Sequence, residues 1–330
     1  MRILVTGGAG YIGSVTTARL LARGHEPVVL DNLSRGHRAA VAASLPLEIL
    51  DTRDRDGVAE VLDRHRIECV MHFAAQSLVG ESMDKPLDYF DANVGGMISL
   101  LGAMESRGVG RLILSSTAAV YGEPDEIPIP ESAPTLPTNP YGHTKLMCES
   151  LMRWQSRGGR LSFVSLRYFN AAGAAGALGE DHRPETHLIP LALQAASGRR
   201  PEIVVYGDDY PTPDGTCVRD YIHVEDLADA HILALDVMDR RSETILNLGN
   251  GRGFSVRDVL VSAERVTGRR VPARVGPRRP GDPAVLVASS EKAREVLRWN
   301  PRRADLDEIV ASAWRWMKDR AGGYGVPATG

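Results

Sequence analysis

The sequence predicts an α/β fold built on a doubly wound parallel sheet with a smaller C-terminal α/β lobe, and three observations lead to this prediction. The chain has 330 residues, 43% of them hydrophobic, which is enough for one large α/β unit or two modest domains. Short, almost wholly apolar runs alternate with segments of helical periodicity, as expected of strands buried between helices. Glycines crowd the first turn, at Gly7, Gly8, Gly10 and Gly13.

The opening of the chain has the pattern of a dinucleotide-binding unit. Ile3–Val5 is typical of a buried strand, and a helix is expected over 14–23. The glycines between them fit G-x-G-x-x-G, in which glycine allows a tight turn and lets a phosphate approach the amides at the helix start. Asp31 closes the next strand, 27–30, where an acid accepts hydrogen bonds from ribose hydroxyls and repels a 2′-phosphate. This pattern predicts a Rossmann-type site for NAD rather than NADP.

The later elements continue the alternation up to residue 167 and become less regular beyond it. Strands are expected at 47–50, 69–73, 111–115 and 161–167, and helices at 54–66, 84–107 and 141–157. In the less regular part, strands are expected at 202–206 and 244–248, and helices at 186–197, 225–239, from Ser255 to about 268, and near 289–297 and 305–320. This order predicts an NAD-binding domain at 1–170, to which segments near 218–250 return, and a substrate lobe made mainly of 171–330.

Composition narrows the classes of function. A formal net charge of -3 argues against a general nucleic-acid surface. The three cysteines, Cys69, Cys148 and Cys217, have neither disulfide-framework nor zinc-ligand spacing, so no metal site is expected. The chain opens on a strand pattern rather than a signal peptide, and no apolar run reaches the length of a membrane span. We therefore expect a soluble, cytoplasmic protein without a membrane or nucleic-acid partner.

Three polar residues indicate the chemistry. Tyr141 and Lys145 lie four residues apart at the start of an expected helix and so share one face. A neighbouring ammonium and a nicotinamide cation would both favour the phenolate of a tyrosine, whose reference pKa is about 10. Tyr141 would then be a base able to work near neutral pH. Thr117 follows an apolar strand at the sheet edge where ligands bind in such folds, so its hydroxyl can relay a proton to Tyr141.

These motifs and several longer segments resemble those of the UDP-glucose 4-epimerases, a family of extended short-chain dehydrogenases/reductases that acts in galactose metabolism. The likeness runs from residue 1 to about 318, and its later segments are more specific than the glycine pattern. The segments that carry it are Val5–Ser14, Asp31–Leu33, His72–Ala74, Val79–Ser82, Tyr141–Lys145, Arg167–Asn170, Gly207–Thr212, Val218–Val224 and Arg279–Asp282.

The resemblance implies a role for each matching position. Tyr141 falls on the catalytic base, Thr117 on the hydroxyl beside it, and Lys145 on the cation that tunes the base. The positions that correspond to NAD contacts are Gly7, Gly10, Tyr11, Ile12, Gly13, Asp31, Asn32, Leu33, Ser34, Asp51, Thr52, Phe73, Ala74, Ala75, Asn93, Thr117, Tyr141, Lys145 and Phe169. The positions that correspond to UDP-sugar contacts are Thr117, Tyr141, Asn170, His187, Leu188, Tyr206, Arg219, Arg279 and Asp282.

The resemblance also implies the reaction and the partners. The reaction is the reversible 4-epimerisation of UDP-glucose and UDP-galactose through a 4-keto intermediate, with tightly bound NAD as the transient hydride acceptor. The substrate partner is a UDP-hexose, and a homodimer is expected through the helices near 84–107 and 141–157. Both helices carry apolar positions on more than one face, at Ile98, Leu100 and Leu101 and at Leu146, Met147 and Leu151.

Three positions depart from the family pattern. Ser77 stands where some members have a lysine that contacts a cofactor phosphate. His187 stands where some members have an asparagine that contacts the nucleotide. Leu286 stands where others have a tyrosine or a smaller residue lining the sugar pocket. This last position leaves epimerisation of UDP-N-acetylhexosamines or UDP-pentoses open as an alternative.

Two further functions are weighed against epimerisation. A nucleotide-sugar dehydratase or decarboxylase shares the glycine loop and the Tyr–Lys pair. Dehydratases, however, place an acid pair after the threonine, where this chain has Ala118 and Ala119, whose methyl groups transfer no protons. The other function is a non-catalytic NAD-binding scaffold, since fold does not imply function. The intact set of Thr117, Tyr141 and Lys145 argues against it.

Overall fold

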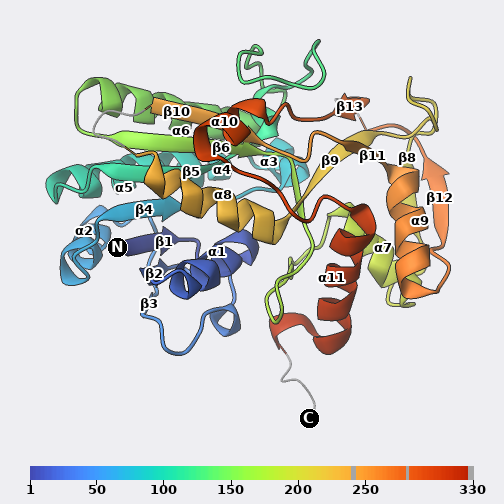
Figure 1. Cartoon of the computed structure of the whole chain (residues 1–330), viewed down its shortest axis with the longest axis horizontal. Helices are drawn as coiled ribbons and strands as arrows, with labels where there is room; N and C mark the ends of the chain where they lie inside the picture. Colours follow the sequence, from blue (N-terminus) through green and yellow to red (C-terminus); the bar gives the residue numbers. More distant parts are fainter. Residues whose placement is uncertain (239–242, 280–281, 326–330) are drawn as a thin grey trace.

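A seven-stranded parallel sheet forms the centre of the larger part of the molecule (Figure 1). The computed structural model describes residues 1–238, 243–279 and 282–325. The strand order is β10-β6-β5-β4-β1-β2-β3, so the chain winds to one side from β1 and to the other side from β4, which confirms the predicted doubly wound fold. The strands are β1 (Arg2–Thr6), β2 (Glu26–Leu30), β3 (Leu47–Glu48), β4 (Cys69–His72), β5 (Arg111–Thr117), β6 (Ser162–Tyr168) and β10 (Glu243–Leu248).

Helices cover both faces of this sheet. In β1, Ile3 and Val5 pack in one core with α1, α8 and α10, while Leu4 packs in a second core with α2, α5 and α6. All three side chains are fully buried, which explains why the strand sequences are continuously apolar rather than alternating. The helices are α1 (Tyr11–Ala22), α2 (Arg55–Arg64), α5 (Gly96–Ser106), α6 (Pro140–Arg157), α8 (Val224–Asp236) and α10 (Glu291–Leu297).

A smaller lobe lies beside the sheet, at the right of Figure 1. Its helices pack around a core that includes Ile189, Val259 and Ile309, and Ser255 caps α9 in a capping box with Asp258, as the sequence predicts. In one small sheet β9 (Val218–His223) pairs with β7 (Asn170–Ala172), β11 (Gly253–Ser255) and β13 (Val285–Leu286). The other elements of the lobe are the paired strands β8 (Ile203–Tyr206) and β12 (Ala273–Gly276) and the helices α7 (Leu188–Ala196), α9 (Val256–Thr267) and α11 (Leu306–Asp319).

The helix predicted over 84–107 is present from Pro86 to Ser106, but it is not α-helical throughout. α4 begins at Pro86 and a π-helical stretch follows over Phe90–Gly95 before α5 begins at Gly96. The π-helical stretch carries the buried Asn93, whose amide donates to Thr144 Oγ1 (2.9 Å) and so ties this segment to α6. Such wide turns are rare, and periodicity in a sequence does not reveal them. The remaining short helical segments are α3 (Val79–Asp84), α4 (Pro86–Tyr89) and the 3₁₀ turns Arg38–Ala40, Ala118–Val120 and Gly323–Gly325.

Other boundaries differ by a few residues. α1 begins at Tyr11, directly after Gly10, rather than at residue 14. The predicted end of the helix at 225–239 reaches residue 239, which lies outside the described residues, and α8 ends at Asp236. The strands β7, β9, β11, β12 and β13 were not predicted as strands, and all but β9 have four residues or fewer, too few to show a period.

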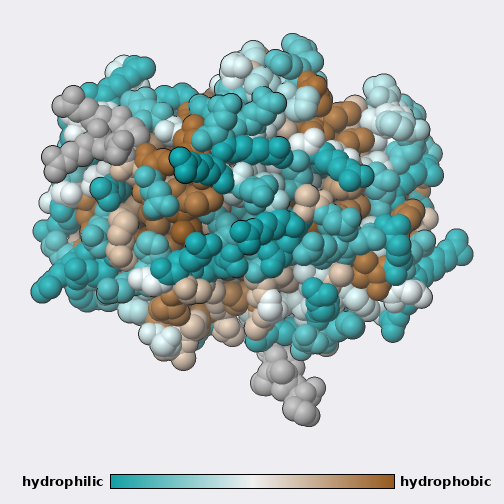
Figure 2. Space-filling view, viewed as in Figure 1, coloured by the Kyte–Doolittle hydropathy of each residue, from teal (hydrophilic) through white to brown (hydrophobic). Residues whose placement is uncertain are grey.

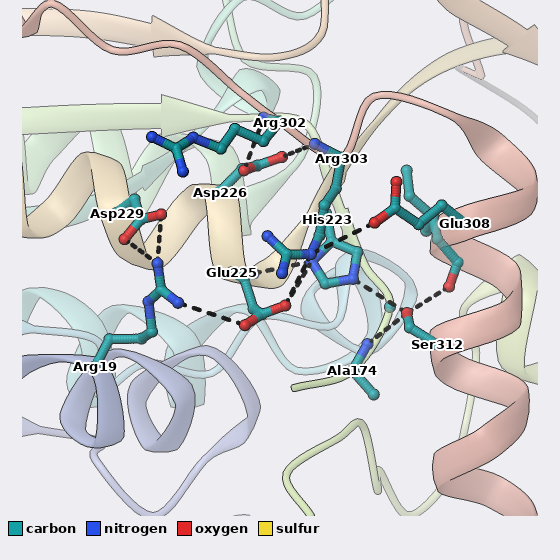
Figure 3. A network of polar contacts seen from close by, with 12 residues as sticks. Arg19, Ala174, His223, Glu225, Asp226, Asp229, Arg302, Arg303, Glu308 and Ser312 are labelled. Atoms are coloured by element: carbon teal, nitrogen blue, oxygen red, sulfur yellow. Dashed lines mark hydrogen bonds and ion pairs between the residues drawn. The ribbon is translucent and has the colours of Figure 1, made fainter. Parts of the chain in front are cut away.

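A polar network joins the lobe to the helices over the sheet (Figure 3). Glu225 on α8 pairs with Arg19 of α1 (3.5 Å) and with Arg303 of the segment before α11 (2.9 Å). His223 lies 3.1 Å (Nε2) from Ser312 Oγ of α11. Burial lowers the pKa of His223 to about 3, so its ring is neutral at pH 7. These contacts hold α11 and α1 on either side of the start of α8.

The molecular surface is mainly polar on the face shown in Figure 2, where hydrophobic residues form several separate areas. None of the helices in the described part of the chain combines the length and the apolar character that a membrane crossing requires. Apolar areas of limited size are normal on a folded domain and call for a partner only where they are contiguous.

A buried ion pair fastens α6 to the sheet. Glu149 on α6 and Arg167 on β6 are 0% and 2% exposed, and Arg167 Nη2 lies 2.6 Å from Glu149 Oε2. Glu149 Oε1 also accepts hydrogen bonds from Ser116 Oγ (2.7 Å) and Ser165 Oγ (2.9 Å). Arg167 donates in turn to the hydroxyl of Tyr121 (2.9 Å). Both charges are thus paired and hydrogen-bonded, the condition under which ions are tolerated in a protein core.

We expect Arg167→Met to destabilise the protein by about 3–5 kcal/mol, because it leaves the carboxylate of Glu149 buried without its partner. Arg265→Met is the matched control, since Arg265 forms a similar pair with Asp307 (2.6 Å) but its side chain is 61% exposed. Water screens that pair, so its loss should change stability far less. Thermal unfolding of both variants measures the difference, and equal shifts of the two melting temperatures would contradict the prediction.

Candidate active site

The glycine turn after β1 leaves no room for side chains. Gly7 has a φ of 70°, in the left-handed region, and a Cβ there would lie 2.5 Å from the backbone nitrogen of Ala74. A Cβ on Gly13 would lie 2.2 Å from the carbonyl oxygen of Gly7. Gly10 precedes α1 and has no side chain to cap the helix, so amides of the first turn are open to a ligand. The turn is therefore a cradle that fits the pyrophosphate of a dinucleotide.

Asp31 stands beside this turn at the end of β2. Its carboxylate accepts hydrogen bonds from the amides of Ala9 (3.0 Å) and Leu33 (2.8 Å), which fix its direction. Burial raises the pKa of Asp31 above its usual value, although the two amide hydrogen bonds oppose that rise. Asp31 is thus held at the sheet edge, where the hydroxyls of a ribose bound at the glycine turn could reach it.

The loop after Asp31 forms a cluster of hydrogen-bonded polar residues at the same edge of the sheet. Asn32 Nδ2 donates to Asp51 Oδ2 (2.9 Å), and the hydroxyl of Ser34 donates to Asn32 Oδ1 (2.7 Å). Hydrogen bonds from Arg53 hold the pKa of Asp51 well below its usual range, so this carboxylate stays ionised. Thr52 beside it is buried. These predicted cofactor positions, which come from two separate loops, therefore lie together.

The end of β4 closes the other side of the glycine turn. The amides of Phe73 and Ala74 both donate to the carbonyl oxygen of Thr6 (2.9 and 3.1 Å), which continues the pairing with β1 past the strand ends. Ala75 follows, half-buried. Asn93 holds this turn through its side chain, which accepts from the amide of Gln76 (2.8 Å). The crevice between β1 and β4 is thus formed by backbone and small side chains.

Tyr141, Lys145 and Thr117 meet between α6 and the end of β5. Asn139 caps α6 by accepting from the amide of Gly142 (2.8 Å), so the helix begins one residue before Tyr141. The side chain of Thr117 lies beside the hydroxyl of Tyr141 and lowers the pKa of that tyrosine. The buried Lys145 donates from Nζ to the carbonyl of Ser115 (2.9 Å). The predicted tyrosine–lysine–threonine set is therefore brought together at the carboxyl edge of the sheet.

Burial controls the proton affinities of this set. It raises the pKa of Tyr141 to about 12, and the hydrogen bond with Thr117 only partly opposes the rise. Burial also lowers the pKa of Lys145. Both shifts arise because a low-dielectric site penalises the charged form of each group. A positive charge placed in the crevice would oppose the shift at the tyrosine, so formation of the phenolate would depend on a bound cation.

One cavity in the smaller lobe is lined by seven of the nine predicted substrate positions. The other two, Thr117 and Tyr141, lie at the end of β5 and the start of α6, outside the lining of this cavity. Pro280 and Gly281, which complete the segment at 279–282, lie outside the described residues. The seven positions are Asn170, His187, Leu188, Tyr206, Arg219, Arg279 and Asp282.

Two arginines of this cavity differ in their partners. Arg219 on β9 pairs with Asp282, which balances its charge. The guanidinium of Arg279 lies 3.9 Å from the centre of the ring of Tyr206, a cation–π geometry. A planar guanidinium suits the oxygens of a phosphate, to which it can donate two parallel hydrogen bonds. The cavity can therefore hold a flat ring and an anion.

The positions that depart from the family pattern occupy three different environments. Ser77 is exposed. His187 precedes α7, and its Nδ1 lies 2.8 Å from a carboxylate oxygen of Glu180 and 2.8 Å from one of Glu185. Leu286 packs in the same apolar cluster as the predicted cofactor position Phe169.

Sequence reasoning missed several residues of the cavity. Glu180, Arg200 and Cys217 line it beside the predicted positions. Arg200 follows α7 in a turn and Cys217 precedes β9, and neither lies in a motif with a known spacing. Glu180 lies near two histidines in the sequence, a signal that could have singled it out.

Comparisons with known proteins agree with this geometry. The sequence profile of the NAD dependent epimerase/dehydratase family matches residues 3–249. UDP-glucose 4-epimerase of Streptomyces lividans is 55% identical over 324 residues, which cover 98% of each chain. A crystal structure of a UDP-glucose 4-epimerase has a TM-score of 0.95 at 50% identity and covers 99% of this chain and 100% of its own.

A second solved structure, UDP-glucose 4-epimerase from Bifidobacterium longum in complex with NAD+ and UDP, is 38% identical, has a TM-score of 0.93 and covers 98% of this chain and 100% of its own. The glycine cradle, the tyrosine–lysine–threonine set and these likenesses over almost the whole length lead to one conclusion. The chain belongs to the NAD dependent epimerase/dehydratase family and, within it, to the UDP-glucose 4-epimerases.

Proposed function

We propose that the chain catalyses the reversible 4-epimerisation of UDP-glucose and UDP-galactose through a 4-keto intermediate. The observation that carries the proposal is the tyrosine–lysine–threonine set at the carboxyl edge of the sheet, next to the glycine cradle. Membership of the UDP-glucose 4-epimerases supports the choice of substrate. The methyl groups of Ala118 and Ala119 beside Thr117 offer no acid pair for dehydration.

The residues of the crevice fit NAD. Gly7 and Gly13 place no side chain in the cradle, so a ligand can lie directly against the backbone there. The open amides of α1 suit a pyrophosphate. Asp31 is placed for the ribose hydroxyls and would repel a 2′-phosphate. When bound, NAD supplies a reversible acceptor for the hydride of sugar C4, so the overall reaction has no net redox change.

The proposed base is Tyr141. The phenolate of Tyr141 takes up the proton of the sugar 4-hydroxyl through Thr117, whose hydroxyl gives its own proton to the phenolate as it accepts that of the sugar. Lys145, held by the carbonyl of Ser115, lies one helical turn along the same face of α6 and stabilises the phenolate. Burial raises the pKa of Tyr141 to about 12, so a positive charge on the bound cofactor would favour formation of the base.

The proposed anchors for the nucleotide lie in the cavity of the smaller lobe. Tyr206 would stack along the uracil, and Arg219 and Arg279 would bind the diphosphate. Inversion requires the hydride to return to the opposite face of the keto-sugar, so the hexose must turn about its bond to the diphosphate. Firm anchors on UDP and the apolar side chain of Leu286 as a wall of the sugar site are consistent with that turn.

This division of roles follows the two parts of the chain. We propose that residues 1–170, with segments near 218–250, bind NAD and that 171–330 mainly bind the UDP-sugar. α8 packs on α1 and β10 completes the large sheet, which supports the return of the second segment. A cytoplasmic location forms part of the proposal, because Cys69, Cys148 and Cys217 are buried and unpaired.

We further propose a homodimer through the helices near 84–107 and 141–157. Large apolar side chains are exposed on both, among them Leu87 (80%), Ile98 (56%) and Trp154 (66%). The two helical segments pack against each other where α6 meets the π-helical stretch, so they are neighbours on the protein surface. A paired copy would cover this surface and remove its apolar area from water.

The reaction is tested with purified protein and UDP-galactose, without added NAD. We expect UDP-glucose to form and no NADH to accumulate, because the hydride is returned in each cycle. Tyr141→Phe should lower turnover by about 10²–10⁴-fold with bound NAD unchanged, since it removes only the base. Chromatography of the products and absorbance of the bound cofactor provide both readouts. A need for stoichiometric NAD, or full turnover by Tyr141→Phe, would refute the mechanism.

The anchors are tested by calorimetric titration of UDP. Arg219→Ala and Arg279→Ala should each weaken binding by about 1.5–3 kcal/mol, the loss expected for one charge-assisted contact. Arg278→Ala is the control, because Arg278 also stacks on a tyrosine, Tyr210, at 4.2 Å, but does not line the cavity. Its effect should be small. Unchanged affinity in both Arg219→Ala and Arg279→Ala would rule out this anchoring scheme.

The dimer is tested by light scattering at micromolar concentration. The wild-type protein should have the mass of two chains, and Ile98→Glu combined with Trp154→Glu should have the mass of one, because two buried charges would oppose the contact. Val261→Glu, an equally exposed apolar position (55%) on α9, is the control and should stay dimeric. A wild-type monomer would reject the proposal.

A further inference from the structure

Four potential metal ligands converge between β7 and α7. Cysteine spacing predicts no metal site in this chain, but this group contains none of the cysteines. One ligand atom from each of the four side chains lies within 4.8 Å of all the others. The group, called the Glu–His cluster below, consists of Glu180, His182, Glu185 and His187.

The spacing of these atoms matches a small, four-coordinate ion. His187 Nδ1 lies 2.8 Å from Glu180 Oε1 and 2.8 Å from Glu185 Oε1. His182 Nδ1 lies 3.1 Å from Glu180 Oε1 and 3.9 Å from Glu185 Oε2. Tetrahedral bonds of about 2.0–2.2 Å to zinc separate neighbouring ligand atoms by about 3.4 Å. The four distances lie on both sides of this value, so the ligand atoms would have to move to surround one ion.

Hydrogen bonds account for part of this arrangement, since the amides of Thr186 and His187 both donate to Glu185 Oε1 (2.7 and 2.8 Å). A ring nitrogen carries at most one hydrogen, yet His187 Nδ1 faces two carboxylate oxygens at the same distance. Glu180 and Glu185 have side chains only 7% and 9% exposed, and across the ranges that the structure describes no lysine or arginine is paired with either. Two neighbouring carboxylates withdrawn from water need a compensating positive charge. The charge of Glu180 raises the pKa of His187 well above its usual value, so a protonated His187 balances one of the two carboxylates without an ion.

We propose that the Glu–His cluster binds one zinc ion. Two imidazoles and two carboxylates are ligands that zinc accepts in tetrahedral geometry, whereas magnesium and calcium prefer sites made of oxygen alone. Four protein ligands leave no open position for a reacting water, so the ion is structural rather than catalytic. The proposal does not require the reaction assigned above, but it gives His187, a predicted UDP-sugar contact in the nucleotide cavity, a second role as a zinc ligand.

The ion would hold a segment that both halves of the active site use. The carbonyl oxygen of Asp181 lies 2.9 Å from His37 Nε2, and that of Arg183 accepts from Arg35 Nη1 (2.9 Å), so 181–183 contact the loop after Asp31. Glu180 and His187 line the nucleotide cavity at the start of α7. Zinc at the Glu–His cluster would therefore fix the distance between the loop after β2 and the nucleotide cavity.

Metal analysis of the untagged protein, purified without chelator and with its cofactor bound, tests the proposal directly. We expect about one zinc per chain, as in a closed structural site. His182→Gln and Glu185→Gln should lose it, and neither residue lines the nucleotide cavity. His65→Gln is the matched control, because His65 Nε2 also contacts a glutamate, Glu48 (2.7 Å), but lies outside the cluster. It should keep its zinc.

Removal and return of the metal test the wild-type chain, so the result does not depend on the folding of any variant. Chelation should lower the melting temperature, and zinc but not magnesium should restore it. Cobalt in place of zinc should give the intense visible absorption of a tetrahedral site, absent in His182→Gln. A wild-type protein that neither contains zinc nor binds it when added would overturn the proposal. Full zinc content in both cluster variants would overturn the assignment of the site.

Discussion

The buried ion pair between Glu149 and Arg167 fixes the helix on which the proposed chemistry depends. Tyr141, Lys145 and Glu149 follow one another at four-residue intervals on α6, so they lie along one face of that helix. Glu149 is bound to Arg167 of β6, and Lys145 reaches the carbonyl of Ser115 on β5. α6 therefore cannot slide or rotate over the sheet without leaving a buried charge unpaired. The buried contacts of α6 therefore fix the position of Tyr141, the proposed base of the reaction.

The order of the strands imposes the second constraint. β1 and β4 are neighbours in the sheet but lie on opposite sides of the point where the winding reverses. Their carboxyl ends therefore open into a crevice, and the close approach of Gly7 to Ala74 keeps it narrow. The same order places β5 beside β4, and β5 continues past their last pair, His72 and Leu114, to Thr117. A parallel sheet with this winding thus assembles residues separated by more than a hundred positions.

The sequence predicts those features whose cause is local in the chain. The glycine turn, Asp31 and the Tyr141–Lys145 spacing each depend on a few adjacent residues, and the structure places all of them at one edge of the sheet. The smaller lobe is harder to predict because its strands are short and pair over long distances; β13 has two residues. The burial of the Asn93 side chain depends on a π-helical stretch, which the hydrophobic periodicity of the sequence does not reveal. The two glutamates and two histidines of the Glu–His cluster do lie within eight residues of one another in the sequence. Cysteine spacing alone does not reveal this pattern.

The pairing of β13 with β9 places Leu286 directly beside Arg219 on the neighbouring strand. The proposed wall of the sugar site and the proposed anchor of the diphosphate are thus paired residues on neighbouring strands. The two-residue strand is held in register by few bonds, one of them from the amide of Val218 to the carbonyl of Ala284 (2.8 Å). A larger or smaller side chain at 286 would displace this pairing as well as reshape the sugar site. A substitution that widens the range of accepted sugars would therefore also weaken the binding of the nucleotide. Sugar range and nucleotide affinity cannot evolve independently in this scaffold.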